Sequence, residues 1–164
     1  MPDTQSMPPA GPVTPHLVVS DAKAAIAFYE RAFGAAKLYR LDAPDGRVLH
    51  ASVGINGGII FLCDDFPEYA GGKKGTPDAL GGSPVSIHLH VADADALFNR
   101  AVAAGAVVTM PLADQFWGDR FGKLRDPFGH EWSIAATIRT VSEEDMRRAA
   151  DAFAAPAGSG ADGI

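Results

Sequence analysis

The sequence predicts an α+β fold made of two β-α-β-β-β units in tandem. The main observation is an internal repeat, in which HLVVSD at residues 16–21 recurs as HLHVAD at residues 88–93. Each copy continues into a helical pattern that ends in Gly-Ala, and the offset of 72 residues from His16 to His88 returns between Gly57 and Gly129. One unit of this size cannot bury both faces of its own sheet, so we expect the two copies to share one core.

Length and composition fit one domain, or two small halves fused into one. The chain has 164 residues, of which 47% are hydrophobic and 21% are charged, as is ordinary for a globular protein. The single cysteine, Cys63, ends the apolar run at residues 58–63, and no basic residue flanks it. We therefore expect a buried, reduced thiol rather than a nucleophile.

The first unit follows the expected order of elements. Residues 13–19 have β-branched, loosely alternating character and predict a strand. Asp21 is placed to cap a helix over residues 22–33, which Gly34 ends. Three further strands are predicted, separated by the turn sequences PDG and NGG: residues 37–41, 48–55 and 59–62.

The second unit repeats this order. Residues 85–91 predict a strand, and Asp93 caps a helix that runs to Gly105. The sequence DPFG at residues 126–129 is a turn in which proline and glycine are both favoured. Three more strands are predicted: residues 107–110, 121–125 and 132–137.

The two modules span residues 13–63 and 85–138, and we expect disorder in residues 1–12 and 156–164. Residues 139–155 are expected to contain a C-terminal helix, which begins at a capping box formed by SEED at residues 142–145. Residues 64–84 are rich in glycine, proline and charge. A connection of this length is either a lid over a pocket or a slack linker.

The net charge of −6 argues against a nucleic-acid partner. No apolar stretch is long enough for a membrane helix, and residues 1–12 lack the order of a signal peptide, so we expect a cytoplasmic protein without a membrane partner. An acidic domain with several aromatic residues favours a cationic small molecule, although such a charge also serves solubility.

Four sequence runs carry a resemblance to a known family: Phe28-Tyr29 in the first helix, DQFWGDRFG at 114–122, DPFGH at 126–130 and SEEDM at 142–146. Together with the repeat they resemble the vicinal oxygen chelate superfamily, which contains glyoxalase I, bleomycin- and fosfomycin-resistance proteins and extradiol dioxygenases. The nearest similarity is to its glyoxalase-like, PhnB-like branch, over residues 13–153. The resemblance implies an eight-stranded, cup-shaped sheet with the helices outside, a cavity beneath the strands, and a homodimer.

The resemblance also implies a divalent metal held by His or Glu from the first and last strands of each half. Counting back from the capping aspartates places these positions at Thr14 and Ser86, and the last-strand positions at Phe61 and Ser133. Hydroxyls and a phenyl ring do not compete with water for such a metal, so no metal or other cofactor is predicted.

Histidines lie close to these positions. His16 is two residues beyond Thr14, and His88 and His90 are two and four beyond Ser86, so they are expected to face the cavity together, with His50 joining them. They are interpreted as neutral hydrogen-bonding groups of a wet pocket. The alternative is a displaced divalent metal, for which Glu131 is the nearest carboxylate.

An aromatic cluster is the other candidate for ligand binding. Trp117 and Phe121 are suited to stack a planar ligand, and Arg120 to anchor its carboxylate or phosphate. Alternatively, Arg120 pairs with Asp119 or Asp126 and holds the loop. Tyr29 and Trp132 are predicted to lie in the core.

Two functions follow from these expectations. The first is a binding protein without a metal, which sequesters a small aromatic or polar-cationic molecule. The second is a metal-dependent lyase, isomerase or dioxygenase in which His88 or His90 also serves as general base. Glyoxalase I activity is not expected, because Phe61 and Ser133 replace its acid–base carboxylates.

Overall fold

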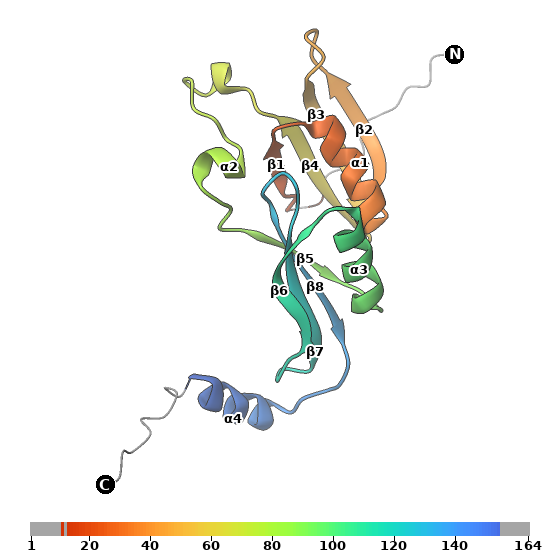
Figure 1. The fold of residues 1–164 in the computed structure, drawn as a ribbon, viewed down its shortest axis with the longest axis vertical. Coiled ribbons are helices and arrows are strands. Elements are labelled where there is room, and N and C mark those ends of the chain that lie inside the picture. Colours follow the sequence, from red (N-terminus) through yellow and green to blue (C-terminus); the bar gives the residue numbers. More distant parts are fainter. Residues whose placement is uncertain (1–10, 12, 155–164) are drawn as a thin grey trace.

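The computed structural model describes residue 11 and residues 13–154, so the tails predicted to be disordered lie almost wholly outside the described residues. The element order is that of two tandem β-α-β-β-β modules joined by a connector and followed by a helix (Figure 1). The first module comprises β1 (His16–Val19), α1 (Ala22–Phe33), β2 (Ala36–Asp42), β3 (Val48–Ile55) and β4 (Gly58–Asp64). The second comprises β5 (Ser86–His90), α3 (Ala94–Ala104), β6 (Val107–Asp114), β7 (Asp119–Arg125) and β8 (Glu131–Thr137).

The predicted α+β class and the tandem modules are confirmed, and the eight strands form two four-stranded sheets. Sheet 1 has the strand order β1-β4-β3-β2 and sheet 2 the equivalent order β5-β8-β7-β6. In both, the first and last strands of the module run parallel and the other neighbours antiparallel. Within the described part of the chain no strand of one sheet is hydrogen-bonded to the other, so one chain does not form a single eight-stranded cup.

Both module helices begin and end as predicted. The carboxylate of Asp21 accepts a hydrogen bond from the Ala24 amide, and that of Asp93 accepts one from the Ala96 amide, each at 2.9 Å. At the other ends Gly34 has φ 68° and Gly105 φ 118°, a left-handed conformation that costs glycine little. The repeated sequence therefore produces the same caps at both ends of the two helices.

Strand boundaries differ from the predictions where the chain lies at a sheet edge. β6 continues to Asp114 through Pro111, which an edge strand tolerates because its outer amides have no partner. Bulges in the β6–β7 register accompany the proline. β1 is shorter than predicted, because the first residue of the expected strand that pairs with β4 is His16.

Each sheet has one face covered by its helix and one face that we call the open face. Leu17, Ile60 and Leu62 point from sheet 1 toward α1 and are buried. Strand neighbours point the opposite way, so His16, Phe61 and Cys63 lie on the open face. The Cys63 thiol is consequently half-buried rather than buried, and burial raises its pKa, with Asp64 and Asp65 adding to the effect.

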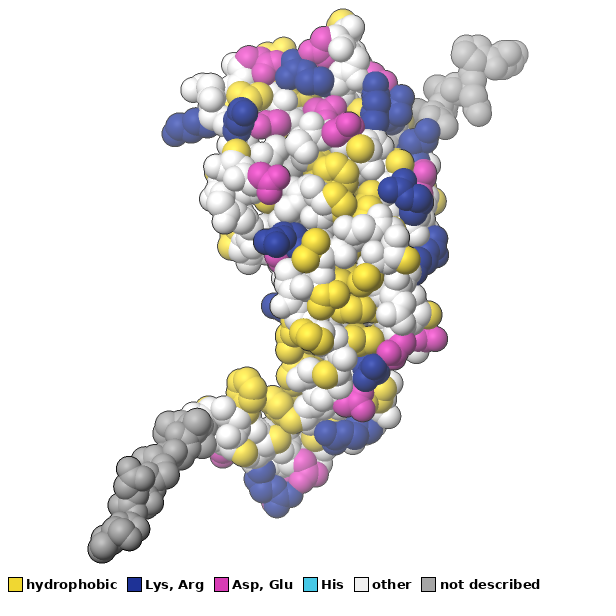
Figure 2. All heavy atoms as spheres, viewed as in Figure 1, with side chains coloured by type: hydrophobic (Ala, Val, Ile, Leu, Met, Phe, Trp, Pro, Cys, Tyr) yellow, Lys and Arg dark blue, Asp and Glu magenta, His cyan; other side chains and the backbone are white. Residues whose placement is uncertain are grey.

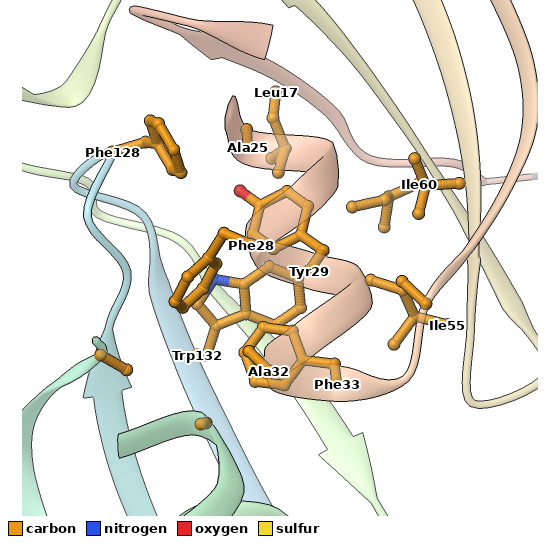
Figure 3. Close-up of a cluster of buried hydrophobic side chains, with 14 of the residues drawn as sticks. Leu17, Ala25, Phe28, Tyr29, Ala32, Phe33, Ile55, Ile60, Phe128 and Trp132 are labelled. Atoms are coloured by element: carbon orange, nitrogen blue, oxygen red, sulfur yellow. The ribbon is translucent and has the colours of Figure 1, made fainter. Parts of the chain in front are cut away.

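The shared core lies where the modules meet. α1 packs on α3, and the rings of Tyr29 and Phe33 lie 5.2 and 4.5 Å from that of Trp132 (Figure 3). Tyr29 and Trp132 are fully buried, as predicted. Arg100 of α3 adds a polar link, because its guanidinium donates to the backbone carbonyls of Glu30 and Arg31 near the end of α1.

The surface reflects this arrangement. On the face shown in Figure 2, apolar side chains gather around the middle of the molecule, and charged side chains concentrate toward its two ends. No helix among the described residues is long and apolar enough to cross a membrane.

The connector between the modules is hydrogen-bonded at several points rather than slack. It contains η1 (Pro67–Tyr69) and α2 (Pro77–Leu80). Arg47, in the turn just before β3, binds Glu68 and lies 4.1 Å from the Phe66 ring centre. Pro77 packs on Gly129, where φ is 89° and a Cβ would lie 2.8 Å from the proline ring.

The last helix, α4 (Glu143–Ala154), begins at the predicted capping box. The Ser142 hydroxyl accepts a hydrogen bond from the Asp145 amide at 3.1 Å. No residue of α4 is buried, although Phe153 reaches the ring of Phe116 at 5.9 Å. In Figure 1 this helix projects from the end of the second module.

Candidate functional site

The predicted histidines lie on the open faces of both sheets, as two pairs. The ring centres of His16 and His50 are 6.0 Å apart on sheet 1, and those of His88 and His90 are 6.1 Å apart on sheet 2. Among the described residues no ring contact joins one pair to the other. The expectation that the four histidines meet in one cavity of the chain is therefore not met, because the strands divide them between two sheets.

On sheet 1 the histidine pair is part of an aromatic surface. Phe61 lies 4.7 Å from His50 and 6.1 Å from His16, measured between ring centres, and Tyr39 lies 6.1 Å from His50. The edge of one ring meets the face of the other in both contacts with Phe61, an arrangement that aromatic quadrupoles favour. His50 Nε2 is also 3.1 Å from the Ser52 hydroxyl.

The His16 imidazole is held toward its neutral form. Burial lowers its pKa from the usual value, and the nearby His50 lowers it further. A neutral ring offers one donor and one acceptor to a ligand, whereas an imidazolium offers two donors. The open face of sheet 1 thus combines aromatic rings with a neutral polar group.

On sheet 2 the histidines are bound to hydroxyls of the neighbouring strand. His88 Nδ1 lies 2.8 Å from the Ser133 hydroxyl, and His90 Nε2 lies 3.2 Å from that of Thr137. The Phe121 ring is parallel to His88 within 21°, at 6.3 Å between centres. The second ring nitrogen of His88 remains available to a ligand.

The structure divides the predicted aromatic cluster. Trp117 stays with Phe121, 5.6 Å away, and its indole N–H donates to Asp119. Arg120 points to the opposite, helix-covered face, where it pairs with Asp95 of α3 and Asp114. Adjacent strand residues face opposite ways, so Arg120 is separated from Phe121, and neither aspartate predicted to pair with it does so.

These ion pairs shift the pKa values of Arg120 and Asp95. Hydrogen bonds from its guanidinium to Asp95 and Asp114 raise its pKa, and the same contact lowers the pKa of Asp95. Its donors are already engaged in a fork geometry, with two nitrogens on Asp95. Arg120 therefore acts as a link between β7, β6 and α3.

The strand pairing shows which side chains lie next to the expected metal-ligand positions. His16, rather than Thr14, pairs with Phe61, and His88, rather than Ser86, pairs with Ser133. Each sheet thus presents one imidazole beside a residue that is no metal ligand. Glu131, the nearest carboxylate on sheet 2, accepts a hydrogen bond from Thr109. This donor set does not match two pairs of His or Glu ligands.

Groups of three or more potential ligand side chains are likewise not found among residues 13–154.

A crevice links the edges of the two open faces. It has a volume of about 190 Å³ and lies between Pro15 and Ile59 of the first module and Ile87, His88 and Trp132 of the second. His88 therefore belongs both to the open face of sheet 2 and to the junction of the modules.

Two side chains on the open faces were not singled out from the sequence. Tyr39 joins the aromatic surface of sheet 1, and Lys123 lies beside Ser133 on sheet 2. The two-residue alternation of β7 could have revealed Lys123, because it follows Phe121 by two positions. The position of Tyr39 could not be predicted from the two-residue alternation, because a bulge shifts the β2–β3 register between Lys37 and Tyr39.

The fold and the open faces define a class of protein built from paired β-α-β-β-β modules that expose a polar and aromatic surface on each sheet. A family model described as the Glyoxalase/Bleomycin resistance protein/Dioxygenase superfamily matches residues 11–134. The chain belongs to this superfamily.

Proteins similar to this chain cover 80–90% of its length. Uncharacterized protein Rv0887c of Mycobacterium tuberculosis is 49% identical over 147 residues, which cover 90% of this chain and 86% of the relative. The solved structure of TioX from Micromonospora sp. ML1 is 28% identical, with a TM-score of 0.60 over 80% of this chain and 100% of TioX. FosX from Listeria monocytogenes, described as a fosfomycin resistance protein, shares the fold alone, at 17% identity and a TM-score of 0.61 over 84% of this chain and 98% of FosX.

Proposed function

We propose that this protein binds and sequesters a small, planar organic molecule between open faces of its sheets, without a resident metal. The observation that carries the proposal is the pairing of histidine with an aromatic ring on each open face: His50 with Phe61, and His88 with Phe121. Apolar walls with a few placed polar groups are typical of small-molecule sites. Sequestration also suits the bleomycin resistance protein that the description of the superfamily names.

The cavity is completed, in this proposal, by a second copy of the chain. The open face of sheet 1 leaves Leu41 47% exposed, and that of sheet 2 leaves Val107 54% exposed. Within one chain the modules meet through their helices, so the two open faces do not cover each other. A homodimer in which sheet 1 of one chain faces sheet 2 of the other buries both surfaces and brings the two histidine pairs together.

The alternative is a metal-dependent lyase, isomerase or dioxygenase. The observation that favours it is the matching position of His16 and His88, each paired with the last strand of its module. In a homodimer the two imidazoles would approach from opposite walls. The absence of a carboxylate at Phe61 and Ser133 speaks against it.

Two measurements test the proposal. Light scattering should give a dimer, and Leu41→Glu should convert it to a monomer, because the substitution places a charge on an apolar interface. Leu80→Glu, on the exposed connector, is the matched control and should leave the dimer intact. A wild-type monomer would contradict the proposed cavity.

Metal content distinguishes the two functions. Protein purified without chelators should contain no stoichiometric divalent metal, and EDTA should leave its melting temperature unchanged. Stoichiometric manganese, iron, nickel or zinc that is lost in His16→Ala and His88→Ala would overturn the metal-free proposal in favour of the alternative.

A further inference from the structure

Lys123 holds a central place on the open face of sheet 2. Its register partners are Met110 on β6 and Ser133 on β8, and Ser133 in turn binds His88. Phe121, two residues earlier on β7, lies on the same face. The Lys123 side chain is half-buried.

Lys123 makes no ion pair in the described part of the chain. Every ion pair found there is made by an arginine. The two carboxylates on the same face keep their charge but hydrogen-bond to neutral donors rather than to Lys123: Glu131 accepts from Thr109, and Asp119 accepts from Trp117 and Thr137. The cation therefore faces the space above the sheet without a partner.

The opposing wall of the proposed cavity cannot neutralise it either. Strand residues on the open face of sheet 1 include histidines, tyrosine, phenylalanine, serine and aliphatic side chains, and the described ones carry no carboxylate. Arg40 and Asp42 pair with each other, and Asp64 points toward α1, where it accepts from the Ala22 amide. The open face of sheet 1 therefore contributes no carboxylate to Lys123, and a buried ammonium is stabilised by an anion placed directly beside it.

We infer that the molecule bound on the open face of sheet 2 carries an anionic group, a carboxylate or phosphate, that pairs with Lys123. The inference rests on the proposed function and names its ligand class. The neighbouring His88 adds a hydrogen bond through Nε2, since its Nδ1 is held by Ser133, and Phe121 stacks on the planar part of the ligand.

The net charge of −6 does not oppose this assignment. At physiological salt, charges more than about 8 Å apart on an exposed surface are largely screened, so the groups beside the ligand decide its sign. The local surface has a cation without a partner, whatever the total charge of the chain. The ligand is accordingly an anion rather than the cation that the overall charge favours.

The test compares three probes of one shape: 2-naphthoate, the neutral 2-naphthamide and the cationic 2-naphthylmethylamine. Calorimetry on the full chain should show that the carboxylate binds at least about tenfold tighter than the amide, because a hydrogen bond between two charged groups is stronger than one to a neutral group. Lys123→Met should abolish this preference, whereas Lys123→Arg should retain it. Lys73→Met, on the connector, is the matched control and should bind like wild type.

The outcomes distinguish the anion site from the proposed cavity. Equal affinity for carboxylate and amide, or retention of the preference in Lys123→Met, would overturn the anion site while leaving the proposed cavity standing. Tighter binding of the amine would overturn it in favour of a cationic ligand. If none of the three probes binds at millimolar concentration, both the anion site and the proposed function are wrong.

Discussion

Asp126 is the residue that fastens the two modules together. Its buried carboxylate accepts hydrogen bonds from the Tyr29 hydroxyl at 2.8 Å and the Trp132 indole at 2.9 Å. It also accepts from the amides of Phe128 and His130, inside its own turn. One side chain thus shapes the Asp-Pro-Phe-Gly turn and holds α1 of the other module against it.

Removal of this carboxylate should be strongly destabilising. Asp126→Ala leaves several buried donors without an acceptor, and we expect a loss of about 3 kcal/mol or more in the free energy of unfolding. Asp126→Asn should cost less, because its carbonyl oxygen still accepts from the turn amides. Urea unfolding measures both, and Asp151→Ala on exposed α4 should change stability by less than about 0.5 kcal/mol. A loss in Asp126→Ala no larger than in this control would show that the turn holds without it.

Tyr29 makes stability depend on alkaline pH. Burial first, and then the Asp126 carboxylate, raise the pKa of its phenol well above the usual value. A raised pKa in the folded state means that the stabilisation is complete below the unfolded pKa of about 10 and is lost as pH rises above it.

Tyr29→Phe should remove this alkaline loss. The variant should be about 1 kcal/mol less stable at pH 8, because a hydrogen bond is lost, yet its urea midpoint should fall less than that of wild type between pH 8 and 11. Tyr69→Phe, which changes an exposed phenol, should follow wild type. Equal alkaline slopes in all three proteins would contradict the role given to Tyr29.

At the residue scale, sequence reasoning succeeded where the physics is local. Asp21 and Asp93 cap their helices, because a carboxylate there needs only the next few amides. The error over Arg120 came from treating neighbours on a strand as one cluster, although Arg120 and Phe121 must face opposite ways. The partners of Arg120 lie on α3 and β6, and no sequence spacing indicates them.

At the scale of elements, α4 differs from the other long helices. It has the same length as α1, 12 residues, but none of its residues is buried. Its ion pairs between Arg147 and Glu143 and between Arg148 and Glu144 are exposed and contribute little. Isolated helices of this length are marginal in water, so α4 depends on its few contacts, such as that of Phe153 with Phe116.

Hydrogen exchange should therefore separate α4 from the rest of the fold. We expect the amides of α4 to exchange through local fraying, and those of α1 and α3 to exchange only through global unfolding. Comparison of exchange at two protein concentrations would also detect cover from a second chain. Protection of α4 equal to that of α1 at the lowest concentration would contradict the prediction.

Which elements form was predictable, because alternation, turn residues and caps agree along the chain. How the elements assemble was less so, since the eight strands divide into two sheets whose open faces do not meet. The resemblance implied one cup, and a cup in one chain and a cup shared by two chains have the same sequence signature. Interfaces between modules depend on side chains such as Arg100 and Trp132, whose partners are distant in the chain.

At the scale of the whole molecule, the modules are expected to fold as one unit. Each would expose a fully buried aromatic residue if separated, Tyr29 in the first and Trp132 in the second. Residues 13–84 and 85–154 expressed alone should show no cooperative thermal transition by circular dichroism, and the full chain should show one. A cooperative transition in either half would show that its core is independent of the other.

Because the two open faces belong to different modules, the proposed dimer has a definite number of ligand sites. Under two-fold symmetry, sheet 1 of each chain meets sheet 2 of the other, so the dimer has two equal cavities and binds one ligand per chain. Within a chain, Asp126 ties the wall of one cavity to the wall of the other through α1 and the turn before β8. In the proposed dimer this link predicts that binding in one cavity changes the affinity of the other, so the binding curves should be examined for cooperativity as well as affinity.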